Sequence, residues 1–230
     1  MFKRMLATGV LVLFALTSTI TAAGATSITA IDNGTAQVIV APATISPAEA
    51  ADLQLMREEE KLAHDVYVEL YEKWGLRVFD SIARSEQQHT DAVLNLLVRY
   101  GISDPAAGNG PGEFNNADLQ ALYDQLVVQG SQSVAEALKV GAAIEEIDIL
   151  DLQESLAETN QADIKRVYNN LLAGSENHLR AFVSNLKTQT GETYTPQHLS
   201  QAAYDAIIAG SNGQGGRQGS WGGRGGGRRP

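Results

Sequence analysis

The sequence predicts an all-α protein built around a four-helix bundle with one long crossover connection. Four long segments each place apolar residues at spacings of three and four, which is the pattern of an amphipathic helix. Capping motifs and glycines mark the ends of these segments. The first and third connections are short, whereas the second is long enough to cross the bundle and to hold a short extra helix.

The first two long helices have start and stop signals in the sequence. Residues 46–49, Ser-Pro-Ala-Glu, are a capping-box pattern with proline at the first helical position, and Gly75 ends the helix that begins there. A second helix is predicted over about 78–100, and Gly101 ends it. The short link makes these two helices antiparallel neighbours.

The second connection is predicted to be a loop followed by a short helix. Residues 101–116 contain Asp-Pro, Asn-Gly and Pro-Gly pairs, which favour turns. The short helix is expected over 117–129. Because this connection is long, it can return the chain to the opposite end of the bundle before the third long helix begins.

The third and fourth long helices complete the predicted bundle. Ser133 and Glu136 form a second capping box, for a helix that reaches about Ala157. Asn160 is predicted to cap a fourth helix that runs to about Lys187. Residues 191–209 are expected to form a short terminal helix that packs on the bundle.

The chain is expected to divide into four segments. Residues 1–25 have a basic start, an apolar run too short to span a bilayer and small residues at its end, which is typical of a Sec-type signal peptide. Residues 26–45 are expected to be a flexible lead-in and residues 46–209 the helical domain. Residues 210–230 are rich in Gly and Arg and are expected to be disordered. These features predict a secreted or periplasmic protein with no membrane anchor after cleavage.

The composition limits the chemistry of any site. The chain has no cysteine, which excludes disulfides, zinc-thiolate sites and iron-sulfur centres. Its formal net charge is −10, and all 27 acidic residues lie between the predicted leader and the tail. An acidic core argues against nucleic-acid binding and favours the attraction of cations. A metal site must therefore use oxygen and imidazole nitrogen.

Each long apolar stripe is interrupted by polar residues near its middle. All four interruptions can meet at one level of the bundle. Several ionised carboxylates cannot be buried together unless protons or cations compensate them, and divalent cations supply that compensation. Glu59 is the alternative to Glu60 on the first helix. The candidate metal ligands are Glu60, Glu86, His89, Glu145, Asp148 and His178.

Two of these motifs resemble those of a known family. Residues 60–67, Glu-Lys-Leu-Ala-His-Asp-Val-Tyr, resemble the first-helix motif of rubrerythrin-type ferritin-like proteins, and residues 82–89, Ile-Ala-Arg-Ser-Glu-Gln-Gln-His, resemble the second. The resemblance extends over residues 47–190 and is nearest to a group of exported ferritin-like proteins of uncharacterised function. It implies a ferritin-like carboxylate site for one or two iron ions, with manganese or another divalent metal as alternatives.

The fourth helix departs from the family pattern. Ser175 stands where that pattern has a glutamate three residues before the histidine. Glu176 lies about 200° around the helix from His178 and cannot replace it. Asp148, on the same stripe as Glu145, is the natural substitute. Both a rearranged two-metal site and a one-metal site remain open at this point.

Two classes of function follow from these observations. The first is a non-haem metal protein that binds iron or manganese and acts as a ferroxidase or peroxidase-type oxidoreductase, or simply as a metal binder. Because the chain has no cysteine, it lacks the electron-transfer module of a rubrerythrin, and turnover would need an external reductant. The second is a metal-free ferritin-like scaffold that binds an envelope component or a protein partner.

The expected partners follow from the same features. Metal ions are the first, and the basic tail suits contact with an anionic envelope polymer, with a plain solubilising role as the alternative. Nucleic acid is not expected as a partner because an exported protein meets little of it. A homodimer is compatible with the sequence.

Overall fold

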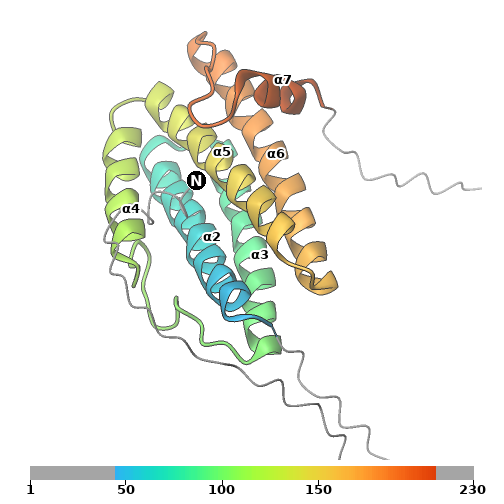
Figure 1. Ribbon diagram of the computed structural model, residues 1–230. Helices are drawn as coiled ribbons and strands as arrows, with labels where there is room; N and C mark the ends of the chain where they lie inside the picture. Colours follow the sequence, from blue (N-terminus) through green and yellow to red (C-terminus); the bar gives the residue numbers. More distant parts are fainter. Residues whose placement is uncertain (1–44, 211–230) are drawn as a thin grey trace, which may run out of the picture.

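The computed structural model describes residues 45–210, and within this range the chain forms six helices and no strand (Figure 1). The all-α class is therefore confirmed. The predicted signal peptide lies outside the described residues, as do nearly all of the lead-in and of the predicted tail. In the described part of the chain, no helix combines the length and apolar character that a membrane span requires. The helices are α2 (Pro47–Trp74), α3 (Arg77–Tyr100), α4 (Ala117–Gly130), α5 (Val134–Glu158), α6 (Ala162–Thr190) and α7 (Gln201–Ala209).

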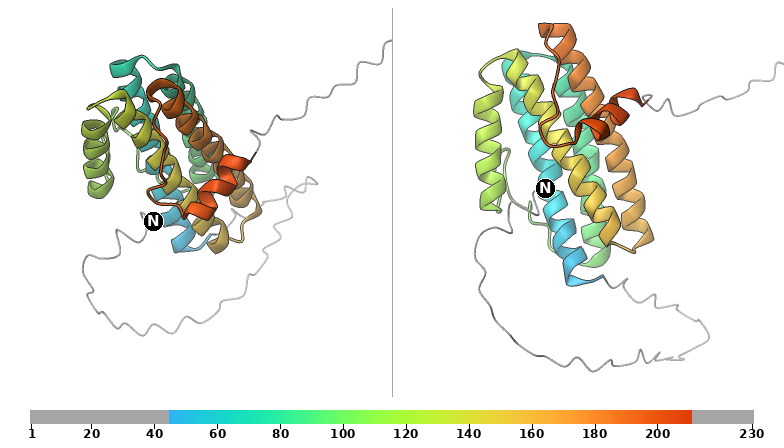
Figure 2. Two further views of the ribbon diagram at one scale, coloured as in Figure 1. Left: turned by 90° about the horizontal axis from the view of Figure 1, so that it is seen from above. Right: turned by 45° about the horizontal axis from the view of Figure 1, so that its top comes forward.

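The long helices pack as two antiparallel pairs. α2 packs most extensively on α3, and α5 on α6; α2 also contacts α5, and α3 contacts α6. Figure 1 shows the segment between α3 and α5, which includes α4, carrying the chain from one end of the pairs to the other. Figure 2 shows α4 along one side and the short α7 across another, where it packs on α6.

Most helix ends follow the capping signals in the sequence. Ser46 Oγ accepts a hydrogen bond from the Glu49 backbone N–H (3.1 Å), and a Glu49 carboxylate oxygen accepts one from the Ser46 backbone N–H (2.9 Å), which completes the capping box. Gly75 and Gly101 end α2 and α3 in the left-handed conformation, at φ values of 65° and 67°.

Three details of the predicted ends are wrong. Asn160 does not cap α6, which begins at Ala162 after Gln161 with no side-chain cap. The Gln161 backbone N–H donates a hydrogen bond to the hydroxyl oxygen of Thr159 (3.2 Å), the residue that ends α5. The second capping box is half formed, since the Glu136 side chain bonds to Gln129 rather than to the cap. Residues 191–200 are irregular, so the terminal helix is shorter than its predicted segment.

The core has two apolar clusters separated by a polar layer. The larger cluster includes Tyr67, Phe79 and Phe182, whose ring centroids lie 5.1 to 6.2 Å apart. The smaller cluster, at the opposite ends of the same long helices, includes Leu53 and Tyr168. The residues between these two clusters are acids and histidines, so the fold places a layer of ionisable groups inside an apolar core.

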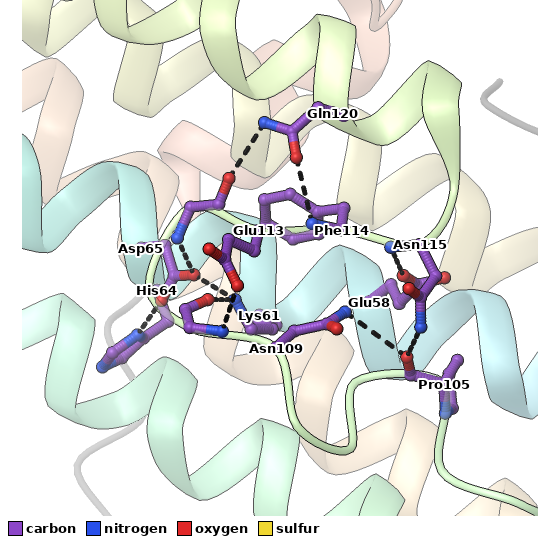
Figure 3. A network of polar contacts seen from close by, with 12 residues as sticks. Glu58, Lys61, His64, Asp65, Pro105, Asn109, Glu113, Phe114, Asn115 and Gln120 are labelled. Atoms are coloured by element: carbon purple, nitrogen blue, oxygen red, sulfur yellow. Dashed lines mark hydrogen bonds and ion pairs between the residues drawn. The ribbon is translucent and has the colours of Figure 1, made fainter.

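The connection before α4 is tied to the outer side of α2 (Figure 3). The Lys61 ammonium donates to Asp65 (2.5 Å) and to the Gly110 carbonyl (2.8 Å), and the Asp65 carboxylate also accepts the Gly112 N–H (2.9 Å). Glu58, only 5 % exposed, accepts the Asn115 N–H (3.1 Å). These contacts hold the loop and thereby position α4 against α2 and α5.

Candidate metal centre

The polar layer brings five of the six predicted ligands into two compact groups. The first group is Glu60, Glu86 and His89, and the second is Glu86, Glu145 and His178. In each group one ligand atom per residue lies within 4.8 Å of the others. The residues come from all four long helices, as their positions in the apolar stripes predicted. Glu86 belongs to both groups.

The two oxygens of Glu86 face different imidazoles. Glu86 Oε2 lies 2.7 Å from His89 Nδ1, and Glu86 Oε1 lies 2.7 Å from His178 Nδ1. Glu60 Oε2 is 3.3 Å from His89 Nδ1 on one side, and Glu145 Oε2 is 3.5 Å from His178 Nδ1 on the other. The imidazole rings stack with centroids 5.6 Å apart. One carboxylate therefore sits between two similar sets of donors.

The donor atoms themselves indicate what the site can hold. Glu60 Oε1, Glu86 Oε1 and both histidine Nδ1 atoms are buried, yet no hydrogen bond with acceptable geometry reaches them. The short nitrogen to oxygen approaches are thus not aligned as N–H···O bonds. Buried polar atoms without partners are destabilising, and a divalent cation would satisfy oxygen and imidazole donors that converge in this way. The residues fit a metal ion.

Neighbouring residues orient the inner donors. His178 Nε2 lies 3.0 Å from Ser85 Oγ, and the tautomer that donates this hydrogen bond leaves the Nδ1 lone pair facing the carboxylates. The buried Tyr67 hydroxyl donates to Glu145 Oε1 (2.6 Å), so the other oxygen is left towards His178. Both contacts resemble the supporting hydrogen bonds that fix metal ligands.

A glycine makes room for the other imidazole. A Cβ atom added at Gly174 would lie 2.6 Å from His89 Cε1 and 2.7 Å from His89 Nε2. Any larger residue on this face of α6 would push the ring out of the first group. This role of Gly174 could not be predicted from its position in the sequence, because an isolated glycine in a helix has many explanations.

The electrostatics of the centre reflect burial and close charges. Burial raises the pKa of Glu60 to about 8. Burial opposes the charge on both imidazoles, but the adjacent carboxylates outweigh it and raise the pKa of His89 to about 11 and that of His178 to about 10. The pKa of Glu86 is lowered because the two imidazoles outweigh its burial. Protons therefore occupy the imidazoles when no metal is bound, and a cation would have to displace them.

Asp148 lies outside both compact groups. The Ser175 hydroxyl donates a hydrogen bond to its carboxylate, so the residue that breaks the family pattern contacts the predicted substitute. Burial, followed by the charges of Glu60 and Glu145, raises the pKa of Asp148 well above its usual range. Its carboxylate is thus close enough to interact with both groups, and its role as a ligand stays a prediction.

Three other ionisable residues near the candidates in the sequence have different environments. Glu146 is 0 % exposed and accepts the backbone N–H groups of Gln197 (2.9 Å), His198 (2.5 Å) and Leu199 (2.9 Å), which fixes the chain before α7. His64 Nδ1 faces Asp65 at 2.8 Å, away from the centre. Glu59, the alternative to Glu60, is in neither group.

Comparison with known proteins identifies the family of this chain. Residues 49–211 match the family described as an uncharacterized protein domain, DUF2202. The uncharacterized protein MJ0754 of Methanocaldococcus jannaschii is 50 % identical over 171 residues, which cover 74 % of this chain and 92 % of the relative. The crystal structure of hypothetical protein MJ0754 matches with a TM-score of 0.72 and 48 % identity, over 75 % of this chain and 98 % of that one. The chain belongs to the DUF2202 family.

Proposed function

We propose that this protein is a ferritin-like metal protein in which α2, α3, α5 and α6 form a four-helix bundle around a non-haem centre. The metal is iron, with manganese as the alternative. The observation that carries the proposal is the pair of compact donor groups that share Glu86. Because the two oxygens of Glu86 face different imidazoles, the arrangement favours two ions bridged by this carboxylate over a single ion.

The protein side of the chemistry is binding and orientation. Glu60 and His89 would hold one ion, Glu145 and His178 the other, and Glu86 both. A bound iron or manganese ion would supply redox chemistry towards oxygen or peroxide. Ser85 keeps His178 in the orientation that binding needs, and Tyr67 does the same for Glu145. The apolar clusters on both sides keep bulk water from these donors.

Metal content tests the binding proposal. The full chain, loaded with ferrous or manganous ions and then freed of excess metal, should retain about two equivalents by elemental analysis. Glu86→Ala removes the shared ligand and should lose most of this metal. Glu69→Ala changes an exposed acid of α2 and is the matched control, which should retain it. Less than about a tenth of an equivalent in the unaltered protein would reject the proposal and favour the metal-free scaffold.

Oxygen and peroxide consumption tests the redox part of the proposal. With ferrous iron, and a small-molecule reductant for repeated turnover, the protein should consume either oxidant faster than the same iron free in buffer. Glu86→Ala should lower the rate to that of free iron. A protein that keeps its metal but gives no rate above free iron would be a metal binder and not an oxidoreductase.

We also propose that the protein is exported and that residues 1–25 are removed. This proposal is supported by the sequence of the leader alone. The intact mass of protein purified from its native host should correspond to a chain that begins after the small residues near position 25. A full-length mass in the cytoplasmic fraction would contradict export.

A further inference from the structure

A partly enclosed cavity lies where α4 covers the contact between α2 and α5. Apolar side chains of all three helices line one part of it, among them Leu62, Leu119 and Ile144. Its volume is about 20 Å³, which is room for one water molecule or one ion. Acids line the remainder: Glu59 and Glu60 from α2, and Asp148 and Asp151 from α5. Burial of carboxylates beside apolar side chains costs free energy, so their presence in this cavity needs a physical explanation.

The cavity reaches the centre through Glu60. This residue lines the cavity and is also a member of the first donor group. It is 2 % exposed, and its Oε1 atom has no hydrogen-bond partner. The neighbouring Glu59 presents a second buried oxygen without a partner. Two unsatisfied acceptors thus border one cavity, and one of them belongs to the centre.

Some acids that line the cavity are not members of the compact donor groups. Asp148 and Asp151 follow Glu145 at intervals of three along α5, so these acids continue along one face of the helix from the centre to the cavity. Neither Glu59 nor Asp151 belongs to a compact donor group. Such a set attracts a cation without chelating it tightly, and a path for ions needs binding strong enough for entry and weak enough for release.

We propose that this cavity is the route by which a divalent cation enters the centre, with Glu59 and Asp151 guiding the ion to Glu60. The inference rests on the proposed function, because a route needs a centre to fill. The apolar residues of α4 narrow the passage, and the acids compensate the charge of the ion while its water shell is being exchanged. Asp148 is a candidate ligand of the centre, so the test uses the other two acids.

The test measures how fast the full chain takes up Co²⁺, followed by its visible absorption after rapid mixing. Glu59→Gln and Asp151→Asn should each slow loading about tenfold, while the amount of cobalt bound at the end stays unchanged. Leu122→Trp, on the α4 side of the cavity, should slow loading without any change of charge. The exposed Glu69→Gln is the matched control on α2 and should load at the unaltered rate. Thermal unfolding of each variant without metal checks that it is folded.

The outcomes separate the route from the centre. If the unaltered protein loads cobalt and the acid variants load equally fast, the route is overturned and the centre stands. A fall in the final cobalt content of Glu59→Gln would make Glu59 a ligand and would also overturn the route. Slow acid variants beside a normal Leu122→Trp would place the passage elsewhere. If the unaltered protein takes up no cobalt, the proposed function itself fails.

Discussion

Acids are buried both in the candidate metal centre and in the contacts around α4 and α7, but their carboxylates differ in their hydrogen-bond partners. Outside the centre, the Asp65 carboxylate accepts hydrogen bonds from the Lys61 ammonium and from one backbone N–H, and the Glu146 carboxylate accepts three from backbone N–H groups. In the centre, buried oxygens of Glu60 and Glu86 have no hydrogen-bond partner. Burial of an acid therefore does not by itself indicate a metal site. Buried acceptors that converge without an aligned hydrogen bond are what supports the proposed metal site.

The run of three acids on α2 contains this contrast within one helical turn. Glu58 binds the connection before α4, Glu59 lines the cavity, and Glu60 joins the first donor group. A run of acids usually marks a solvated face. Here successive residues point about 100° apart around the helix, so each acid meets a different environment.

The largest expected effect on stability concerns a fully satisfied acid. Glu146→Ala would leave three backbone N–H groups before α7 without their acceptor, and the free energy of unfolding should fall by about 3 to 5 kcal/mol. Urea unfolding of the metal-free protein measures this loss. Metal content per folded molecule should not change. A variant as stable as the unaltered protein would show that satisfied acids do not hold this fold together.

The converse change removes an unsatisfied acid. Glu60→Gln should change the free energy of unfolding of the metal-free protein by no more than about 1 kcal/mol, because burial raises the pKa of Glu60 to about 8 and its carboxyl group is already largely protonated near neutral pH. Affinity for Co²⁺ or Fe²⁺ should fall about 100-fold or more. Unfolding with and without metal measures both effects. Strong destabilisation of the metal-free protein, with metal binding retained, would show that Glu60 stabilises the fold and is not a metal ligand.

The pH dependence of metal binding follows from the raised imidazole pKa values. The adjacent carboxylates raise the pKa of His89 to about 11 and that of His178 to about 10, so both imidazoles hold a proton near neutral pH when no metal is bound. Metal binding must release these protons, and affinity should rise as pH rises, by about tenfold per pH unit for each proton released. Titration with Co²⁺ in weak buffer measures the protons directly. Binding without proton release would show that the imidazoles are not ligands.

The all-α fold and the grouping of five candidate ligands could be predicted from the sequence because both depend on local patterns. Apolar periodicity and capping residues define the helices, and each polar break in a stripe marks a residue of the polar layer. Glu86 and His89 are an example, since their spacing of three places them on one helical face. The predicted start of α6 is wrong because Asn160 is a good capping residue by type, whereas α6 begins after Gln161 with no side-chain cap.

The supporting residues could not be predicted because they depend on contacts between helices. Ser85 and His178 are far apart in the chain and meet only when α3 packs on α6. The same holds for Gly174, whose importance is the space it leaves for His89. The different roles of Glu145 and Glu146 likewise require the position of the chain before α7. These are properties of packing, and no spacing rule in one sequence contains them.

The smallest expected effect concerns the departure from the ferritin-like pattern. Ser175→Ala removes the hydroxyl that donates to Asp148, and metal affinity should change only a few-fold, equivalent to about 1 kcal/mol. Asp148→Asn should lower metal content from about two equivalents to about one if this acid replaces the missing glutamate. Elemental analysis and Co²⁺ titration compare the two variants. An Asp148→Asn protein that keeps all its metal would place Asp148 with the satisfied acids, held by Ser175 for structural reasons, and would leave Glu86 as the single carboxylate bridge.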